Sequence, residues 1–254
     1  MKRSEFLSGI CGCAAVLASV FPAQAAPDFF AFFNSKTPLP AQLPAAPAEV
    51  AGVLEMEKIL NRIRAGEPRE TWRPLLERFT TFAGEKGVGA GLRELALAWE
   101  ARARMQEWDA VLLKAYRKKA RYPDSIEALL GTVPESLRTD PWGDPWSYAA
   151  AAPPHSPKLV GQRYVLVPKR FPKFMPLDLA IKAPPQLPVA NLRFSATAGI
   201  SSLEVNSRFL QPSRSFKVAG ERFGNHWVLW LSAQGVILCD ENGFMALGFQ
   251  ASTP

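Results

Sequence analysis

Apolar side chains in the first half of the chain recur every three or four residues, which is the spacing of an α-helix. This pattern covers residues 48–65, 69–83 and 92–120, and charged side chains mostly avoid the apolar positions. The last stretch would form a helix about 40 Å long, which needs a partner surface along much of its side. Four glycines within residues 84–91 predict a loop before it. The pattern therefore predicts a helical first half built around one long helix.

The chain from residue 191 to its end has a different pattern, in which short apolar runs alternate with turn residues. Two four-residue connections that end in glycine separate three of these runs, a spacing typical of β-hairpins. The three runs are residues 227–231, 236–239 and 244–249, and further strands are predicted within 203–210 and 215–218. Roughly five short strands in about 60 residues favour a small, partly open β-barrel.

A cluster of aromatic, proline and aspartate residues lies between these two halves. A tyrosine-proline pair follows the long helix, and the stretch DPWGDPWSY occupies residues 140–148. Its first aspartate can accept hydrogen bonds within its own turn, the next proline fixes a backbone angle, and the glycine permits a left-handed one. The three aromatic side chains are expected to lie over the long helix as a small core. The structural residues of this motif are Tyr122, Pro123, Asp140, Pro141, Trp142, Gly143, Pro145, Trp146 and Tyr148.

The order of a long helix, a Tyr-Pro turn, a short helix, a DPWG-type turn and a strand pair resembles the globular domain of the type II secretion major pseudopilins. The resemblance covers residues 101–167 and implies a long helix packed on a small antiparallel sheet. The chain departs from that family in two ways. It lacks, near residue 10, the pattern of a glycine processing site followed by an apolar helix with a glutamate at its fifth position, and it lacks an acidic calcium loop after the strands. Polymerisation and calcium are therefore not carried over. Residues 191–254 are more weakly similar to small β modules through which pilus-assembly and secretion proteins dock.

The first 25 residues have the pattern of a secretory signal peptide. Lys2 and Arg3 precede an apolar stretch at residues 6–20, and a small-x-small triplet predicts cleavage before Ala26. The mature protein would then be periplasmic or secreted. The alternative is an uncleaved membrane anchor, although a proline at position 22 is unfavourable in a membrane-spanning helix.

Two further segments are rich in proline. Residues 26–47 carry four phenylalanines, which are expected to dock on the folded body or on a partner. Residues 168–190 are expected to form a basic linker, and six cations in and just before it oppose only Asp178: Lys158, Arg163, Lys169, Arg170, Lys173 and Lys182. These cations favour contact with an anionic membrane surface or an acidic protein rather than with nucleic acid. The alternative is a solvated linker.

The composition gives little support to catalysis. The chain has 30 basic and 23 acidic residues, a formal net charge of +7, two histidines and three cysteines. These numbers argue against a histidine-rich metal centre and a disulfide scaffold, and after signal cleavage Cys239 would remain alone as a small buried hydrophobe. Ser201, Ser202, His226 and Asp240 form no recognisable catalytic motif, and no cofactor is expected. Asp140 and Asp144 could be paired carboxylates or calcium ligands, but their setting between prolines is more typical of a turn.

The sequence thus predicts an α+β protein in five parts: a signal peptide (1–25), an extended segment (26–47), a helical and pseudopilin-like domain (48–167), a basic linker (168–190) and a small β-barrel-like module (191–254). The expected function is that of a non-enzymatic, exported structural or docking component of a type II secretion or type IV pilus-like apparatus. Its expected partners are proteins of that assembly and an anionic membrane surface, with no nucleic acid. The alternative is a secreted or periplasmic hydrolase or ligand-binding protein.

Overall fold

The computed structural model describes Phe33 and residues 48–82, 87–151, 163–183, 185, 190–197, 200–207, 215–217, 219–231 and 235–248. The predicted signal peptide, its cleavage site and nearly all of the extended segment 26–47 lie outside these residues. From that segment Phe33 is described, and its ring meets that of Phe244 edge-on, with 5.6 Å between centroids. Docking on the folded body therefore holds for this phenylalanine.

The helical first half follows the predicted pattern closely. It contains α2 (Ala48–Arg64), α3 (Arg69–Thr80) and the 32-residue α4 (Val88–Lys119). Three helices of four residues each follow, α5 (Glu127–Leu130), α6 (Glu135–Arg138) and α7 (Leu177–Ala180). Helix α2 ends at Arg64, because Gly66 then adopts a left-handed angle and Pro68 cannot continue a helix.

The strands form three antiparallel sheets. β1 (Ser147–Ala151) pairs with β2 (Arg163–Val167), and β3 (Ala190–Thr197), β4 (Ile200–Ser207) and β5 (Ser215–Lys217) form a second sheet in that order. The third sheet runs in the order β6 (Arg222–Phe223), β7 (His226–Leu231), β8 (Gly235–Asp240) and β9 (Gly243–Gly248). Helices with antiparallel sheets make the chain α+β, as predicted. Within the described residues the strands close no barrel.

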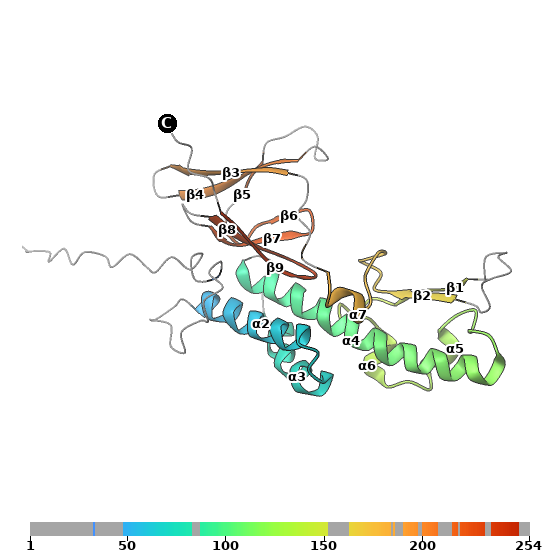
Figure 1. Ribbon diagram of the computed structural model, residues 1–254. Coiled ribbons are helices and arrows are strands. Elements are labelled where there is room, and N and C mark those ends of the chain that lie inside the picture. The colour runs from blue at the N-terminus through green and yellow to red at the C-terminus, as the bar shows by residue number, and fades with distance from the viewer. Residues whose placement is uncertain are drawn as a thin grey trace, which may run out of the picture.

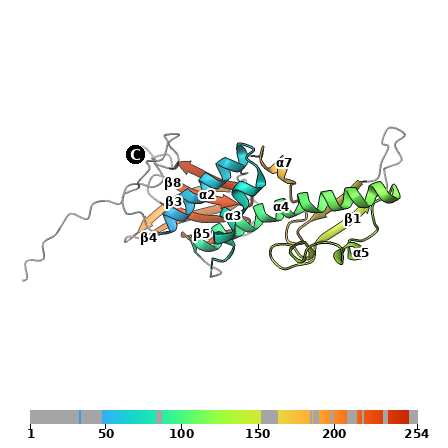
Figure 2. The same ribbon diagram turned by 90° about the horizontal axis from the view of Figure 1, so that it is seen from below.

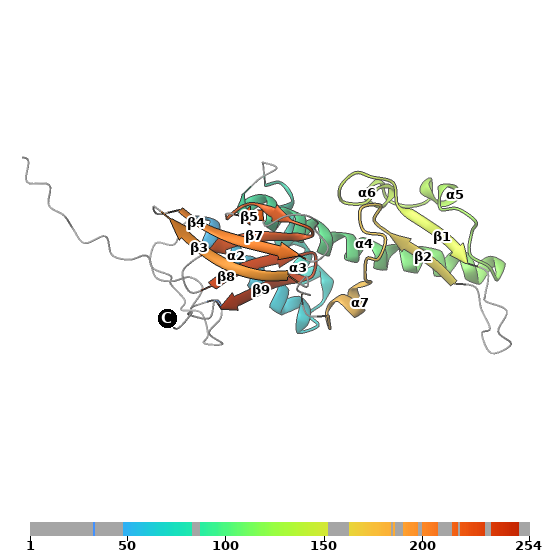
Figure 3. The same cartoon turned by 90° about the horizontal axis from the view of Figure 1, so that it is seen from above.

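Helix α4 is the spine that joins two lobes (Figure 2). The proximal lobe consists of α2, α3, the first half of α4 and the sheets β3–β5 and β6–β9. In it the sheet β3–β5 lies over the sheet β6–β9, which in turn lies over the helices (Figure 1). The distal lobe consists of the second half of α4 with α5, α6, β1 and β2, and α7 lies between the two lobes (Figure 3).

Each lobe has its own hydrophobic core, and α4 contributes to both. In the proximal core, side chains of α2, α3 and α4 pack against β7, β8 and β9, with Trp72 and Trp99 among the largest fully buried residues. In the distal core, Trp108 and Leu112 of α4 pack against Ile126, Leu137 and the strands β1 and β2. The long helix therefore has the partner surface that its length requires.

The loop predicted over residues 84–91 is wrong from Val88 onward, because α4 begins there. The reason is tertiary packing. A side chain at Gly91 would place its Cβ 2.9 Å from Leu229 Cδ2, closer than such atoms approach, and 3.1 Å from Trp227 Cβ, tighter than most contacts of this kind. This glycine lets α4 lie directly on β7, and that contact outweighs the cost of glycine in a helix, about 1 kcal/mol.

The described part of the predicted linker, residues 168–183, also differs from an extended, solvated segment. Phe174, Leu177 and Ala180 are buried, the first in the distal core and the other two in the proximal core. These residues pack the segment against α4 between the lobes. The β sheet β6–β9 likewise shares a core with α2 and α4 and does not stand apart from the helices.

Candidate functional site

The DPWG turn has the geometry that its sequence predicts. Asp140 Oδ1 accepts hydrogen bonds from the backbone N–H groups of Trp142 and Asp144, at 2.9 and 3.0 Å. The backbone N–H of Asp140 donates to the carbonyl of Asp144 at 2.8 Å, and Gly143 has a φ of +87°. Asp140 is only 1% exposed, and this burial raises the pKa of its carboxyl above the usual range. The carboxylate is a turn former, as predicted over the catalytic and calcium alternatives.

The two tryptophans of the turn play different roles. Trp146 is 6% exposed in the distal core, and its indole N–H donates to the carbonyl oxygen of Leu137 at 2.9 Å. The indole N–H of Trp108 on α4 donates to the same oxygen, also at 2.9 Å. One carbonyl of α6 thus joins the turn to the long helix through both of its lone pairs.

Trp142 is half-buried and reaches further along α4. Its indole N–H donates to Glu94 Oε2 at 2.9 Å, and its ring lies 5.3 Å from that of Phe171. Arg104 Nη1 donates to the carbonyl of Thr139 at 3.3 Å. The turn therefore packs along α4 from Glu94 to Trp108, and its aromatic side chains contact the long helix as expected.

All four tyrosines of the chain gather on the distal lobe. Tyr122 lies between Tyr116 and Tyr164, with ring centroids 4.7 and 4.9 Å away, and Tyr148 stacks on Tyr164 at 6.2 Å. The hydroxyl of Tyr148 donates to the carbonyl of Pro123 at 2.7 Å, and that of Tyr164 donates to Asp109. Burial and the neighbouring carboxylate of Asp109 raise the pKa of Tyr164. The sequence motif included Tyr122 and Tyr148, but no sequence pattern indicated that Tyr116 and Tyr164 would cluster with them.

Sequence reasoning missed Arg102, which lies at the junction of the lobes and is fully buried. Its guanidinium donates to the carbonyls of Glu241 and Met175 at 2.5 and 3.3 Å and to Asn242 Oδ1 at 2.7 Å. It also lies between the rings of Trp99 and Phe174, at 4.5 and 4.4 Å from their centroids. Burial lowers the pKa of Arg102 to about 10, so the group remains a cation at neutral pH.

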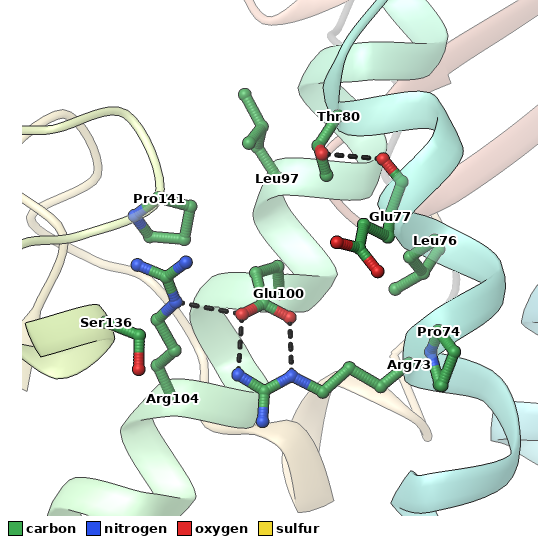
Figure 4. Close-up of a pocket in the computed structure, with 10 residues that line it drawn as sticks. All are labelled: Arg73, Pro74, Leu76, Glu77, Thr80, Leu97, Glu100, Arg104, Ser136 and Pro141. Carbon is green, nitrogen blue, oxygen red and sulfur yellow. Dashed lines mark hydrogen bonds and ion pairs between the residues drawn. The ribbon is translucent and has the colours of Figure 1, made fainter. Parts of the chain in front are cut away.

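A cleft of about 450 Å³ opens between α3, α4, α6 and the DPWG turn (Figure 4). Glu100 stands in it between two arginines. Arg73 donates to both of its carboxylate oxygens at 2.7 and 2.8 Å, and Arg104 donates at 2.8 Å. Burial raises the pKa of Glu100, but the hydrogen bonds from Arg73 and Arg104 outweigh it and hold the pKa below the usual range. The carboxylate therefore serves as an ion-pair centre that joins α3 to α4.

The cations proposed for partner or lipid contact are spread over a strand and two connecting segments. Arg163 begins β2, Lys169, Arg170 and Lys173 lie between β2 and α7, and Lys182 follows α7. These five are exposed, and Arg170 Nε pairs with Asp144 Oδ2 at 3.4 Å. Lys158 lies outside the described residues.

Of the side chains considered for catalysis, His226, Asp240 and Cys239 are buried, and Ser202 is partly exposed. Cys239 and His226 are 1% and 7% exposed, and His226 stacks on Phe223 at 5.5 Å. Burial raises the pKa of the Cys239 thiol, as expected of a small buried hydrophobe. Within the described residues no three His, Cys, Asp or Glu side chains gather as metal ligands would. In the same part of the chain, no helix combines the length and the apolar character needed to cross a bilayer.

No protein-family model, no curated protein and no solved structure matches this chain. Its function is therefore inferred from the geometry of its own residues.

Proposed function

We propose that this protein is a non-enzymatic, exported docking component of a type II secretion or type IV pilus-like apparatus. The observation that carries the proposal is the order of elements in the distal lobe. A long helix, the Tyr122-Pro123 turn, the short α5, the clasped DPWG turn and the hairpin β1–β2 follow in the order that resembles the head of the major pseudopilins. Fold analogy alone does not give a function, so the contacts within this lobe matter more than the order.

The contacts favour a rigid scaffold. The turn is fixed on α4 by both indoles at the Leu137 carbonyl, by Trp142 on Glu94 and by Arg104 on Thr139. A surface held in one conformation loses little entropy when a partner binds. The polar side chains of this region thus hold the turn in place, which suits docking.

The proximal lobe supports a protein that acts singly and does not polymerise through its long helix. Leu92, Leu95 and Trp99 in the first half of α4 are buried against α2, α3 and the sheet β6–β9. This apolar surface is consequently unavailable to other copies of the chain. The distal half, which bears the pseudopilin-like elements, is presented away from it (Figure 2).

Photo-crosslinking in the native cell envelope tests the proposal. A benzoyl-phenylalanine at Val165, which is 54% exposed on β2, should capture a component of a secretion or pilus-like assembly, identified by mass spectrometry. The matched control position is Glu70 on α3 in the proximal lobe, whose side chain is 76% exposed. Capture of no such component at Val165, or the same captured proteins at both positions, would overturn the proposal.

A further inference from the structure

A groove of about 610 Å³ lies at the far end of the distal lobe, between the last turns of α4 and the segment 121–132. Three of its lining residues on α4, Val111, Ala115 and Lys118, follow the i, i+4, i+7 spacing of one helix face. Together with Leu129 of α5, the first two give the groove an apolar part. This face of α4 runs for about 11 Å, which matches two turns of a partner helix.

The charges that line the groove are almost all positive. Lys114, Lys118, Lys119 and Arg121 line it together with a single acid, Asp124. The three lysines are exposed and form no ion pair with any described residue. Arg121 lies 3.9 Å from Asp124, but both side chains are more than half exposed, so this pair neutralises little.

The helix dipole does not account for this charge pattern. Cations in the last turn of a helix are favoured by its carbonyl end, and Lys118 and Lys119 are so placed. Lys114 lies before the last turn, and Arg121 follows the helix, which ends where Ala120 takes a left-handed φ of +51°. A surplus of positive charge along a partly apolar groove instead complements an acidic, amphipathic segment.

The residues outside the described ranges contain no such acidic segment. The acidic residues there are Glu5, Asp28 and Glu85, and no two of them are close in sequence. Residues 152–162, which join β1 to β2 on the same lobe, contain Lys158 and no acid. The 254 residues thus hold no such acidic segment outside the described part, which favours a segment of another protein as the occupant. A groove walled by the segment 121–132 suits a protein segment better than the flat surface of a bilayer.

We propose that this groove binds an acidic, amphipathic helical segment of a partner protein. The inference rests on the proposed docking function and names the chemistry of the partner. Lys114, Lys118 and Lys119 pair with the carboxylates of the segment, while Val111, Ala115 and Leu129 cover its apolar side.

Fluorescence anisotropy with the purified chain tests this proposal. The probe is a fluorescein-labelled peptide, EELDEALEEL, and its neutral counterpart is QQLNQALQQL. Replacing Lys114, Lys118 and Lys119 together by Gln should weaken binding of the acidic peptide about tenfold or more, because three charge pairs are lost. The matched control replaces Lys58, Arg78 and Arg138 by Gln, which removes the same charge from exposed sites outside the groove and outside the six cations considered for partner or lipid contact.

The outcomes separate the groove from general charge attraction. Two results together support the proposal. The control triple changes the affinity for the acidic peptide by less than twofold, and the neutral peptide binds the unaltered chain more weakly than the acidic one does. Equal losses in both triples, or no peptide binding to the unaltered chain, overturn it. Ala128→Glu, which adds a negative charge at an exposed lining position, should weaken binding without loss of fold by circular dichroism.

Two other occupants are outcomes of the same experiment. The first is an anionic membrane. The proposal is overturned in its favour when the chain binds phosphatidylglycerol vesicles but not the peptide, and when replacing Lys114, Lys118 and Lys119 abolishes the vesicle binding. The second is another copy of the chain. A dimer that sedimentation analysis detects and that the same triple variant no longer forms overturns the proposal in its favour. Peptide binding without any secretion component captured at Val165 supports the groove and overturns only the proposed assembly. Capture at Val165 without peptide binding overturns the groove alone.

Discussion

At the scale of single residues, Arg102 is the most consequential side chain of the fold. It brings a permanent charge into the junction of the two lobes, where desolvation opposes it. Its guanidinium hydrogen-bonds to Met175, Glu241 and Asn242, which lie 73 to 140 residues away in sequence. The arginine therefore holds the β8–β9 turn and the segment before α7 on the middle of α4.

Replacing Arg102 by Ala should lower the free energy of unfolding by about 3–5 kcal/mol, because it leaves several buried acceptors without a donor. Urea unfolding followed by tryptophan fluorescence measures the effect. The control Arg117→Ala removes an exposed cation from the same helix and should change stability by less than about 0.5 kcal/mol. Similar losses in the two variants would show that the buried contacts contribute nothing specific.

Asp140 offers a second test at this scale. Asp140→Ala removes the acceptor of two backbone N–H groups and should cost about 1–3 kcal/mol. Asp140→Asn keeps an acceptor oxygen and avoids the buried charge, so it should cost clearly less. Because the pKa of Asp140 is raised in the folded state, the charge costs stability at neutral pH, and this cost falls as the pH drops through the folded pKa. The stability of Asp140→Asn relative to the unaltered protein should therefore fall as the pH drops from 7 into acid, as urea unfolding at both pH values would show.

At the scale of elements, the contact of α3 with α4 depends on a chain of alternating charges. Arg73 joins Glu100 and Glu107, and Arg104 joins Glu100. The groups are only partly exposed, so solvent screens them less than a surface pair. A low folded-state pKa of Glu100 means that its contribution is complete above the unfolded pKa and is lost as the pH falls through the folded one.

Glu100→Gln should therefore destabilise the protein by about 1–3 kcal/mol at pH 7 and by much less at pH 3. Urea unfolding at the two pH values gives the comparison. Glu77 lines the same cleft, is exposed and pairs with no described cation, so Glu77→Gln is the matched control. An equal effect of Glu100→Gln at both pH values would contradict the charge-based account.

At the scale of the whole molecule, α4 runs through both hydrophobic cores and should couple them. Leu92 belongs to the proximal core and Leu112 to the distal core, and each is almost completely buried. Since one helix carries both, loss of packing in one lobe removes part of the surface on which the other is built.

We expect Leu92→Ala and Leu112→Ala each to cost about 2–5 kcal/mol and to loosen both lobes together. Hydrogen exchange read by mass spectrometry should show faster exchange in peptides from α2 and from β1–β2 in either variant. Faster exchange confined to the lobe that carries the substitution would mean that the lobes unfold independently despite the shared helix.

The sequence by itself determined the features that depend on neighbouring residues. Periodicity placed α2, α3 and most of α4, apolar runs placed β7, β8 and β9, and the order of Asp, Pro and Gly gave the turn at residues 140–148. These features follow from local geometry, because a helix face, a hairpin and an Asx turn are each defined within a few residues.

Only the tertiary structure decided how these pieces are joined. The helical start at Val88 depends on how closely Gly91 approaches β7, and the burial of Arg102 depends on a turn some 140 residues later. The packing of the sheet β6–β9 on α2 and α4, the four-tyrosine cluster and the basic groove have the same origin. Such contacts join side chains that are distant in sequence, and a periodic pattern shows which face of an element is buried but not which partner covers it.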